Sequence, residues 1–284
     1  MSKVLIATDG SEVSEYMVEF ALDFALALEF EVFVVYVSDE PIEEGDHEPS
    51  IGEQAVRYAV AEATKRGIVA DSEIIYGIPA VDIIRKSNEI GAKAIIMGSV
   101  GRTGLSRFLV GSVAERVIKL AYGPVIVIRK PEHENGGMKL RSMLIATDGS
   151  EANKPAIRSG LRLASRLSME VSAISVNDKR DAPHTNFSEA WEALNEESKN
   201  AVAEVIQQGH KLGLNVDPII VDGVPHKEIS QRSGNFDIVV IGSVGRSGIF
   251  PGRVGSVAER VVRYAKCPVM VVRSTDTFVP LDPF

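Results

Sequence analysis

Cysteine is almost absent from this chain, and so are features typical of secreted or membrane proteins. The 284 residues include a single cysteine, Cys267, which excludes an internal disulfide framework and fits a reducing cytoplasm. We interpret it as a small buried apolar residue. The apolar stretch Met17–Leu28 is interrupted by Glu19 and Asp23, so we expect no membrane insertion. Residues Met1–Lys3 lead directly into a strand, so no signal peptide is expected. These absences predict a cytoplasmic protein.

Positive charge is also in short supply. There are 31 Lys and Arg against 39 Asp and Glu, which gives a net charge of −8 and argues against a nucleic-acid surface. The five histidines show no metal-ligand spacing, so no metal site is expected beyond a cation carried by a ligand. No Ser/His/Asp or Cys/His arrangement is recognisable, and no catalytic residue is assigned. We interpret the acidic stretch Asp39–Pro49 as a solvated loop and Trp191 as a packing residue.

What the sequence has in abundance is internal repetition. Three blocks recur in the same order: LIATDGSE at Leu5–Glu12 and Leu144–Glu151, GSVGR at Gly98–Arg102 and Gly242–Arg246, and GSVAERV at Gly111–Val117 and Gly255–Val261. This order indicates a duplicated domain, and 284 residues suit two domains of ordinary size. We predict a first domain at 1–130, a linker at 131–139, a second domain at 140–274 and a tail at 275–284. The linker contains Glu-Asn-Gly-Gly and little that could pack.

Each half alternates short apolar runs with helical periodicity. The expected strands are Val4–Ala7, Val32–Val37, Ser72–Tyr76, Ala94–Met97 and Val125–Ile128, then Met143–Ala146, Val171–Val176, Val216–Val221, Ile238–Ile241 and Val269–Val272. Helices are expected between them, beginning with Ser14–Leu28 and ending, in the first half, near Val113–Ala121. Such alternation predicts an α/β fold with two tandem doubly wound domains, each with a parallel sheet covered on both faces.

The fourth strand of each half leads into a glycine-rich loop. Gly98 and Gly101 are followed after nine residues by Gly111, and Gly242, Gly245 and Gly255 repeat that spacing. Glycine lets backbone N–H groups approach an anion, and the helix expected next presents free amides and its positive dipole end. The pattern therefore predicts a phosphate cradle in each half. A Walker A loop is excluded because GxxxxGK[ST] is missing, and a Rossmann site is disfavoured because GxGxxG does not follow the first strand.

An aspartate ends the first strand of each half, at Asp9 and Asp148. If the strand order reverses between strands one and four, both aspartates lie beside the glycine loop. A carboxylate repels phosphates unless it bonds a ribose hydroxyl or holds a cation such as Mg²⁺, so a nucleotide is favoured over bare phosphate. Purely structural interpretations stay open: Asx-turns at the aspartates, and S-x-x-E capping boxes at Ser112 and Ser256.

At these residues the chain resembles a tandem universal stress protein of the ATP-binding subtype. The family signature, G-x2-G-x9-G-[S/T] after the fourth strand and an aspartate after the first, matches in both halves. The resemblance implies a five-stranded parallel sheet of order 3-2-1-4-5 with about four flanking helices in each half. It also implies an adenine nucleotide, ATP or AMP, with Mg²⁺ optional; adenine specificity comes from the resemblance alone.

The resemblance carries roles over position by position. Ala7 and Ala146 would pack on adenine, the backbone at Val37 and Val176 would read it, and the aspartates would face the ribose. The ribose and phosphates would be surrounded by Gly98, Gly101, Gly111 and Ser112 in the first half and by Gly242, Gly245, Gly255 and Ser256 in the second. Arg102 and Arg246 follow the cradle and are candidates for phosphate contact, although exposed arginines are more often only solvated. The loops differ, since only the second contains Pro251-Gly252, and unequal affinities are expected.

Three functions from different classes are compatible with the sequence. We favour a nucleotide-binding regulator of the stress response that acts on an unidentified protein partner. The alternatives are a slow ATPase or nucleotidyl-transfer enzyme and a nucleotide-free dimeric scaffold. Against an enzyme stands the lack of an evident general base, lysine or arginine finger. The resemblance further implies that the halves join through Val125–Ile128 and Val269–Val272 as an intramolecular pseudo-dimer; a further homodimer stays open. Gly255→Val is expected to block the cradle and to strain any left-handed backbone there.

Overall fold

The computed structural model describes residues 1–39, 49–101, 110–129, 140–178, 187–245 and 254–273. These residues form two compact units, one for each repeat. Among them no helix combines the length and the apolar character that crossing a membrane requires.

The first unit is a parallel five-stranded sheet with four α-helices. Its strands are β1 (Lys3–Ala7), β2 (Glu31–Ser38), β3 (Ala70–Tyr76), β4 (Ile95–Gly98) and β5 (Val125–Ile128), and its helices are α1 (Glu12–Leu28), α2 (Ile51–Lys65), α3 (Pro79–Glu89) and α4 (Ser112–Leu120). The strand order is β3-β2-β1-β4-β5. Ala7, the last residue of β1, pairs with Val35 of β2 on one side and with Met97 of β4 on the other.

The second unit repeats this plan. Its strands are β6 (Ser142–Ala146), β7 (Glu170–Asn177), β8 (Val216–Asp222), β9 (Ile238–Gly242) and β10 (Val269–Val272), and its helices are α5 (Lys154–Leu167), α6 (Phe187–His210), α7 (Pro225–Arg232) and α8 (Ser256–Tyr264), with short 3₁₀ turns η1 (Glu151–Asn153) and η3 (Ser233–Asn235). The parallel order is β8-β7-β6-β9-β10. Both units therefore confirm the predicted fold class and strand order.

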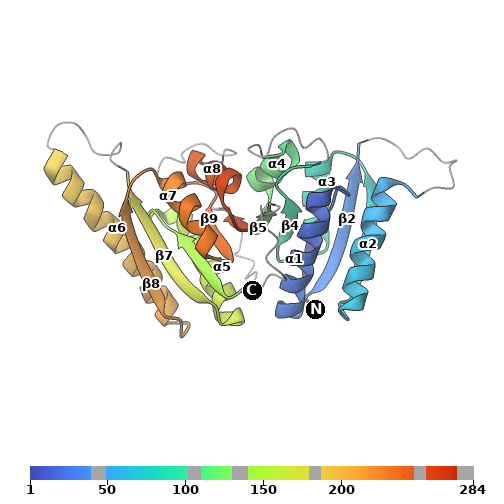
Figure 1. Ribbon diagram of the computed structural model, residues 1–284, viewed down its shortest axis with the longest axis horizontal. Helices are drawn as coiled ribbons and strands as arrows, with labels where there is room; N and C mark the ends of the chain where they lie inside the picture. The colour runs from blue at the N-terminus through green and yellow to red at the C-terminus, as the bar shows by residue number, and fades with distance from the viewer. Residues whose placement is uncertain (40–48, 102–109, 130–139, 179–186, 246–253, 274–284) are drawn as a thin grey trace. The chain divides into compact units, whose positions relative to one another are not determined.

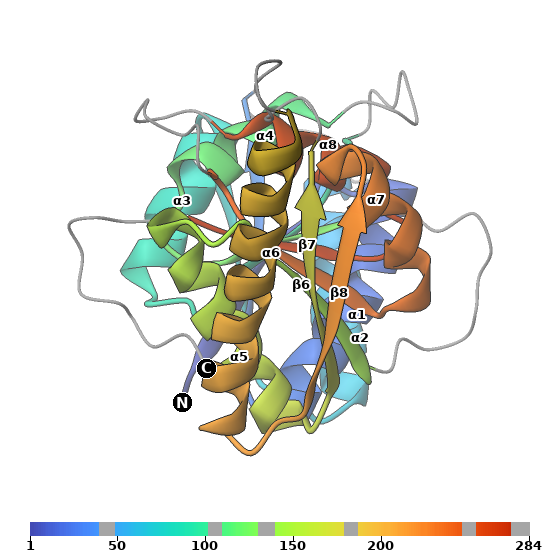
Figure 2. The same ribbon diagram turned by 90° about the vertical axis from the view of Figure 1, so that its left-hand side faces the viewer.

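The core of each unit lies on both faces of its sheet. Four consecutive residues of β1 and of β6 are buried, which requires cover on both sides because neighbouring side chains point to opposite faces. Helix α1 packs with α2 and α3 with α4, while α5 packs with α6 and α7 with α8 (Figure 1). In Figure 2, α6 runs along β7 and β8, the two strands that it contacts most.

Local sequence explains where the first helices begin. Ser11 caps α1 by accepting a hydrogen bond from the backbone N–H of Ser14 at 3.3 Å. Helix α2 begins with a capping box, in which Ser50 and Glu53 each bond the other's backbone N–H, at 3.2 and 2.9 Å. The chain order reverses between β1 and β4, and between β6 and β9. Open parallel sheets bind their ligands outside the carboxyl ends of the strands at such a switch point.

Candidate functional site

A tight turn after the first strand of each unit fixes an aspartate at this switch point. Asp9 Oδ1 accepts a hydrogen bond from the Ser11 N–H at 3.1 Å, and Asp148 Oδ1 accepts one from the Ser150 N–H at 3.0 Å. Gly10 and Gly149, with φ of 73° and 76°, supply the left-handed residue that each turn requires. The aspartates thus form the Asx-turns considered from the sequence. In each turn the oxygen that accepts from the serine N–H is Oδ1.

The other carboxylate oxygen of each aspartate lies against the glycine loop. A Cβ added to Gly101 would lie 2.8 Å from Asp9 Oδ2, and one added to Gly245 would lie 2.5 Å from Asp148 Oδ2. Any side chain at these two positions would collide with the carboxylate, so glycine is needed for this close approach. The expectation that each aspartate lies beside its glycine loop is confirmed in both units.

The last glycine of each signature stands at the N-cap of a helix, and its backbone N–H ties it to the end of the fourth strand. The N–H of Gly111 donates to the Ser99 carbonyl and the N–H of Gly255 to the Ser243 carbonyl, each at 2.7 Å. These glycines are the N-caps of α4 and α8, and in the part of the chain that the structure describes no side-chain cap is present at either helix. The first helical residues are Ser112 and Ser256. Among the described residues no capping side chain therefore occupies the amides of the first turn, as an anion site at a helix N-terminus requires.

Two details of the sequence interpretation were wrong here. Ser112 and Ser256 do not form capping boxes, because each stands one residue inside its helix, where its side chain cannot reach back as an N-cap does. Their partners in that pattern pair with the next turn instead, Glu115 with Lys119 and Glu259 with Arg263. Nor does Gly255 have a left-handed backbone: its φ is −63°, so a side chain there would obstruct ligand without backbone strain.

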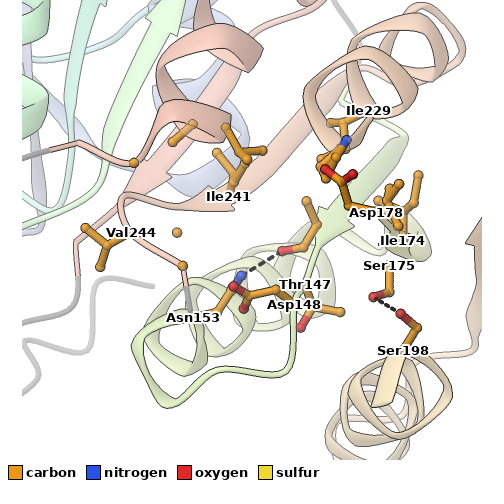
Figure 3. A pocket seen from close by; sticks show the side chains of 18 of the residues that line it. Thr147, Asp148, Asn153, Ile174, Ser175, Asp178, Ser198, Ile229, Ile241 and Val244 are labelled. Carbon is orange, nitrogen blue, oxygen red and sulfur yellow. Dashed lines mark hydrogen bonds between the residues drawn. The ribbon is translucent and has the colours of Figure 1, made fainter. Parts of the chain in front are cut away.

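In the second unit these parts enclose a single pocket of about 620 Å³ (Figure 3). Seven of the residues named from the sequence line it: Ala146, Asp148, Val176, Gly242, Gly245, Gly255 and Ser256. A cavity of this size suits a small-molecule ligand. In the first unit, Asp9, Gly98, Gly101, Gly111 and Ser112 take the same positions around the ends of β1 and β4, and Ala7 and Val37 lie at the ends of β1 and β2. Arg102 and Arg246 lie outside the described residues.

The pocket also contains polar residues that the sequence analysis missed. Asn153 donates from Nδ2 to the Ala146 carbonyl at 3.2 Å, and its Oδ1 is buried without a hydrogen-bond partner in the described structure. Ser175 of β7 and Ser198 of α6 lie with their hydroxyl oxygens 3.1 Å apart (Figure 3). None of the three belongs to a repeated block, so repetition could not reveal them. Aligning the two halves outside the blocks would have found these differences.

The chemistry of the pocket favours an anion with a polar body. The glycine-loop backbone and the N-terminus of α8, which has no side-chain cap among the described residues, stand on one side, and the Asp148 carboxylate stands beside them. The helix terminus attracts negative charge, whereas the carboxylate attracts a hydroxyl or a cation. Within the described ranges, no group of three or more His, Cys, Asp or Glu side chains has metal-site geometry.

The fold and site define a class: a tandem, doubly wound α/β protein with a glycine-loop site at the switch point of each repeat. The family model of the universal stress protein family matches the chain twice, at residues 1–129 and 139–273. The chain therefore belongs to the universal stress protein family, as the sequence motifs indicated.

A curated relative and a solved structure of similar length agree with this assignment. A universal stress protein of Mycobacterium tuberculosis (strain H37Rv) is 30% identical over 234 residues, which cover 79% of this chain and 77% of the relative. The crystal structure of a universal stress protein from Archaeoglobus fulgidus is 25% identical, with a TM-score of 0.70, and covers 96% of this chain and 97% of its own. Another universal stress protein from Archaeoglobus fulgidus, solved in complex with dAMP, matches 45% of this chain and 98% of its own, at 27% identity and a TM-score of 0.38.

Proposed function

We propose that this chain is a regulatory protein of the stress response that binds an adenine nucleotide, ATP or AMP, in each half. The observation that carries the proposal is the second-half pocket, where one cavity joins the Asp148 carboxylate, the glycine loop and the uncapped start of α8. A nucleotide matches this combination, because it presents phosphates to the amides and ribose hydroxyls to the carboxylate.

Most of the predicted residues have a stated role in the proposal. Backbone N–H groups at the start of α8 donate to phosphate oxygens, and Gly242 and Gly245 let the phosphates approach the backbone. Asp148 accepts from the ribose or holds a Mg²⁺ ion that the nucleotide carries. The backbone of Val176 reads the adenine, a role that rests on family resemblance. In the first half the corresponding residues are Gly98, Gly101, Gly111, Ser112, Asp9 and Val37, and Arg102 and Arg246 remain candidates for phosphate contact.

A slow ATPase is the alternative that shares this site. Among the described residues that line the pocket there is no lysine or arginine, the side chains that neutralise developing charge during phosphoryl transfer. Holding phosphates in the ground state does not by itself accelerate their transfer. We therefore propose binding as the function and hydrolysis as incidental. The pairing of the halves through their fifth strands, a further homodimer, the protein partner and a cytoplasmic location stay predictions.

The test is mass spectrometry of small molecules released when the freshly purified full chain is denatured. We expect an adenine nucleotide, with up to two molecules per chain. Release of ATP without ADP or AMP would favour binding over hydrolysis. No released nucleotide, followed by no uptake of added ATP–Mg²⁺, would contradict the proposal and favour a nucleotide-free scaffold.

A further inference from the structure

In the first unit a tyrosine ring lies directly on the backbone of helix α2. A Cβ added to Gly52 would lie 2.6 Å from Cδ1 of Tyr36, so only glycine allows the ring this position. The side chain of Tyr36 projects from β2 beside the end of β1 and is 6% exposed. The space between β2 and α2 is therefore filled by an aromatic ring.

In the second unit the two matching positions are serines. On the strands, Ala7 at the end of β1 pairs with Val35, and Ala146 at the end of β6 pairs with Ile174. The next residue along the paired strand is Tyr36 in the first unit and Ser175 in the second. On the helices, Ala55 of α2 and Ala201 of α6 occupy matching positions, because Ala55 lies near Gly10 and Ala201 lies near Gly149. Three residues before each alanine stand Gly52 and Ser198. The pair Tyr36 and Gly52 is thus exchanged for Ser175 and Ser198.

This exchange replaces a filled space with a polar wall of the second-half pocket. Ser175 and Ser198 both line that pocket, and they are 2% and 3% exposed. The Ser198 hydroxyl also donates to Asn177 Oδ1 at 2.6 Å, and Asn177 Nδ2 donates to Asp222 Oδ1 at 3.1 Å. The chain of bonds ties α6 to β7 and β8, so the hydroxyls are held in place at the pocket wall.

We propose that Ser175 and Ser198 form a subsite of the second-half pocket that accepts a hydrogen-bonding substituent on the base of the bound nucleotide. The subsite neighbours Val176, where the proposed function places the base, and the inference rests on that function. A serine hydroxyl both donates and accepts, so either serine can exchange its mutual bond for one to the ligand. The first-half site lacks the subsite because the Tyr36 ring occupies its space, and it excludes the same substituent.

The probe is ATP that carries a 2-hydroxyethyl group on N6, compared with unmodified ATP by titration calorimetry on the full chain. Gly111→Val leaves only the second-half site open, and Gly255→Val leaves only the first. We expect the probe to bind within about threefold of ATP at the second-half site and at least tenfold more weakly than ATP at the first. N6-propyl-ATP, which has a methyl group in place of the hydroxyl, should bind the second-half site more weakly than the probe.

Exchanging the residues should exchange the preference. In the Gly111→Val background, Ser175→Tyr with Ser198→Gly should lower the ratio of probe affinity to ATP affinity at least tenfold. In the Gly255→Val background, Tyr36→Ser with Gly52→Ser should raise it. The two exchanges are independent, so if circular dichroism shows that one variant is unfolded, the other decides.

The outcomes separate the subsite from the proposed function. ATP binding with equal ratios at both sites, or with rejection of the probe at the second-half site, would overturn the subsite alone. Binding of neither ATP nor the probe to a folded chain would overturn the proposed function and the subsite with it.

Discussion

Asp9 and Asp148 occupy the same turn in the two halves, yet different side chains hold their carboxylates. In the first half the Ser14 hydroxyl, from the first turn of α1, donates to Asp9 Oδ1. In the second half the Ser150 hydroxyl donates to Asp148 Oδ1 at 2.7 Å, from within the turn itself. The residue that matches Ser14 is Asn153, which bonds the Ala146 carbonyl instead.

The start of the following helix accounts for this difference. Helix α1 begins at Glu12, whereas in the second half a 3₁₀ turn intervenes and α5 begins at Lys154 with a proline in its first turn. Proline suits the first turn because its missing N–H would have no partner there. The comparison teaches that duplication has kept the backbone part of the site, the glycines and aspartates, while the side chains behind it have diverged.

Blocking one cradle at a time should give the largest effect. Gly255→Val places a β-branched side chain where phosphate would lie, and it should weaken nucleotide binding to the second half at least a hundredfold. Gly111→Val should do the same to the first half alone. Both glycines have φ of −63°, and an added Cβ would lie 3.4 Å from the nearest carbonyl oxygen, so the fold should persist.

Equilibrium dialysis with labelled ATP measures the loss, and thermal unfolding checks the fold. Gly123→Val is the matched control, because Gly123 precedes a proline and has room for a side chain. The nearest atom to an added Cβ there is the Lys93 carbonyl oxygen, at 3.9 Å. Equal weakening by the control, or undiminished affinity in Gly255→Val, would remove the cradle from the account.

Cys267 offers a reporter for the second half alone, since Gly123 stands at the matching position. The Cys267 side chain is partly exposed, and not fully buried as expected from the sequence. Burial, together with Asp237, raises the pKa of its thiol to about 12, and thiol reagents need the thiolate, so labelling of the folded chain at pH 8 should be slow. In urea below the unfolding midpoint, ATP–Mg²⁺ at thirty times its Kd should slow labelling about thirtyfold. Gly255→Val should abolish that protection and Gly111→Val should keep it. The opposite pattern would contradict assignment of the second site to the second half.

Neutralising the aspartate should have an intermediate effect that depends on the ligand. Asp148→Asn keeps an acceptor for the turn, and it should weaken ATP about tenfold, or about 1.4 kcal/mol. Inorganic pyrophosphate has no ribose and gains from the loss of a repelling charge, so its affinity should not fall. Titration of each ligand into the Gly111→Val background separates the cases. Equal weakening of both would instead indicate that Asp148 acts on the phosphates through a cation.

The smallest effect should come from the side chains behind the aspartates. Ser14→Ala removes a hydroxyl that donates to Asp9 Oδ1 and accepts from the Asp9 N–H at 3.2 Å. It should weaken the first-half site about threefold, because the Ser11 N–H still holds the Asp9 carboxylate. Asn153→Ala at the matching position leaves the Ser150 support of Asp148 in place and should change second-half affinity less than twofold. Competition assays in the single-site backgrounds measure both. Equal effects of the two substitutions would show that the difference between the turns has no functional consequence.

The sequence predicted the elements and the backbone of the site well, for a physical reason. Buried parallel strands must be continuous apolar runs, and Val125–Ile128 and Val269–Val272 were predicted with the bounds that the structure has. Asp9 and Gly101 could be brought together because strand order alone decides which strand ends meet. Domain limits and residue roles toward a ligand stay predictions.

The rest depended on information that local patterns do not contain. An S-x-x-E pattern does not decide whether a helix begins at the serine or just after it. Helix α2 begins after Ser50, which caps it, whereas α4 begins at Ser112 itself, which therefore does not. The subsite at Ser175 and Ser198 arises from packing between strand β7 and α6, the helix that follows it in the chain. Only the position-by-position comparison with Tyr36 and Gly52 gives it meaning.

The most direct test of the account is the number of ATP–Mg²⁺ molecules that the full chain binds, measured by titration calorimetry. We predict two per wild-type chain, and one each for Gly255→Val and Gly111→Val. A stoichiometry of two that neither substitution changes, or no binding by the folded wild-type chain, would contradict one glycine-loop nucleotide site in each half.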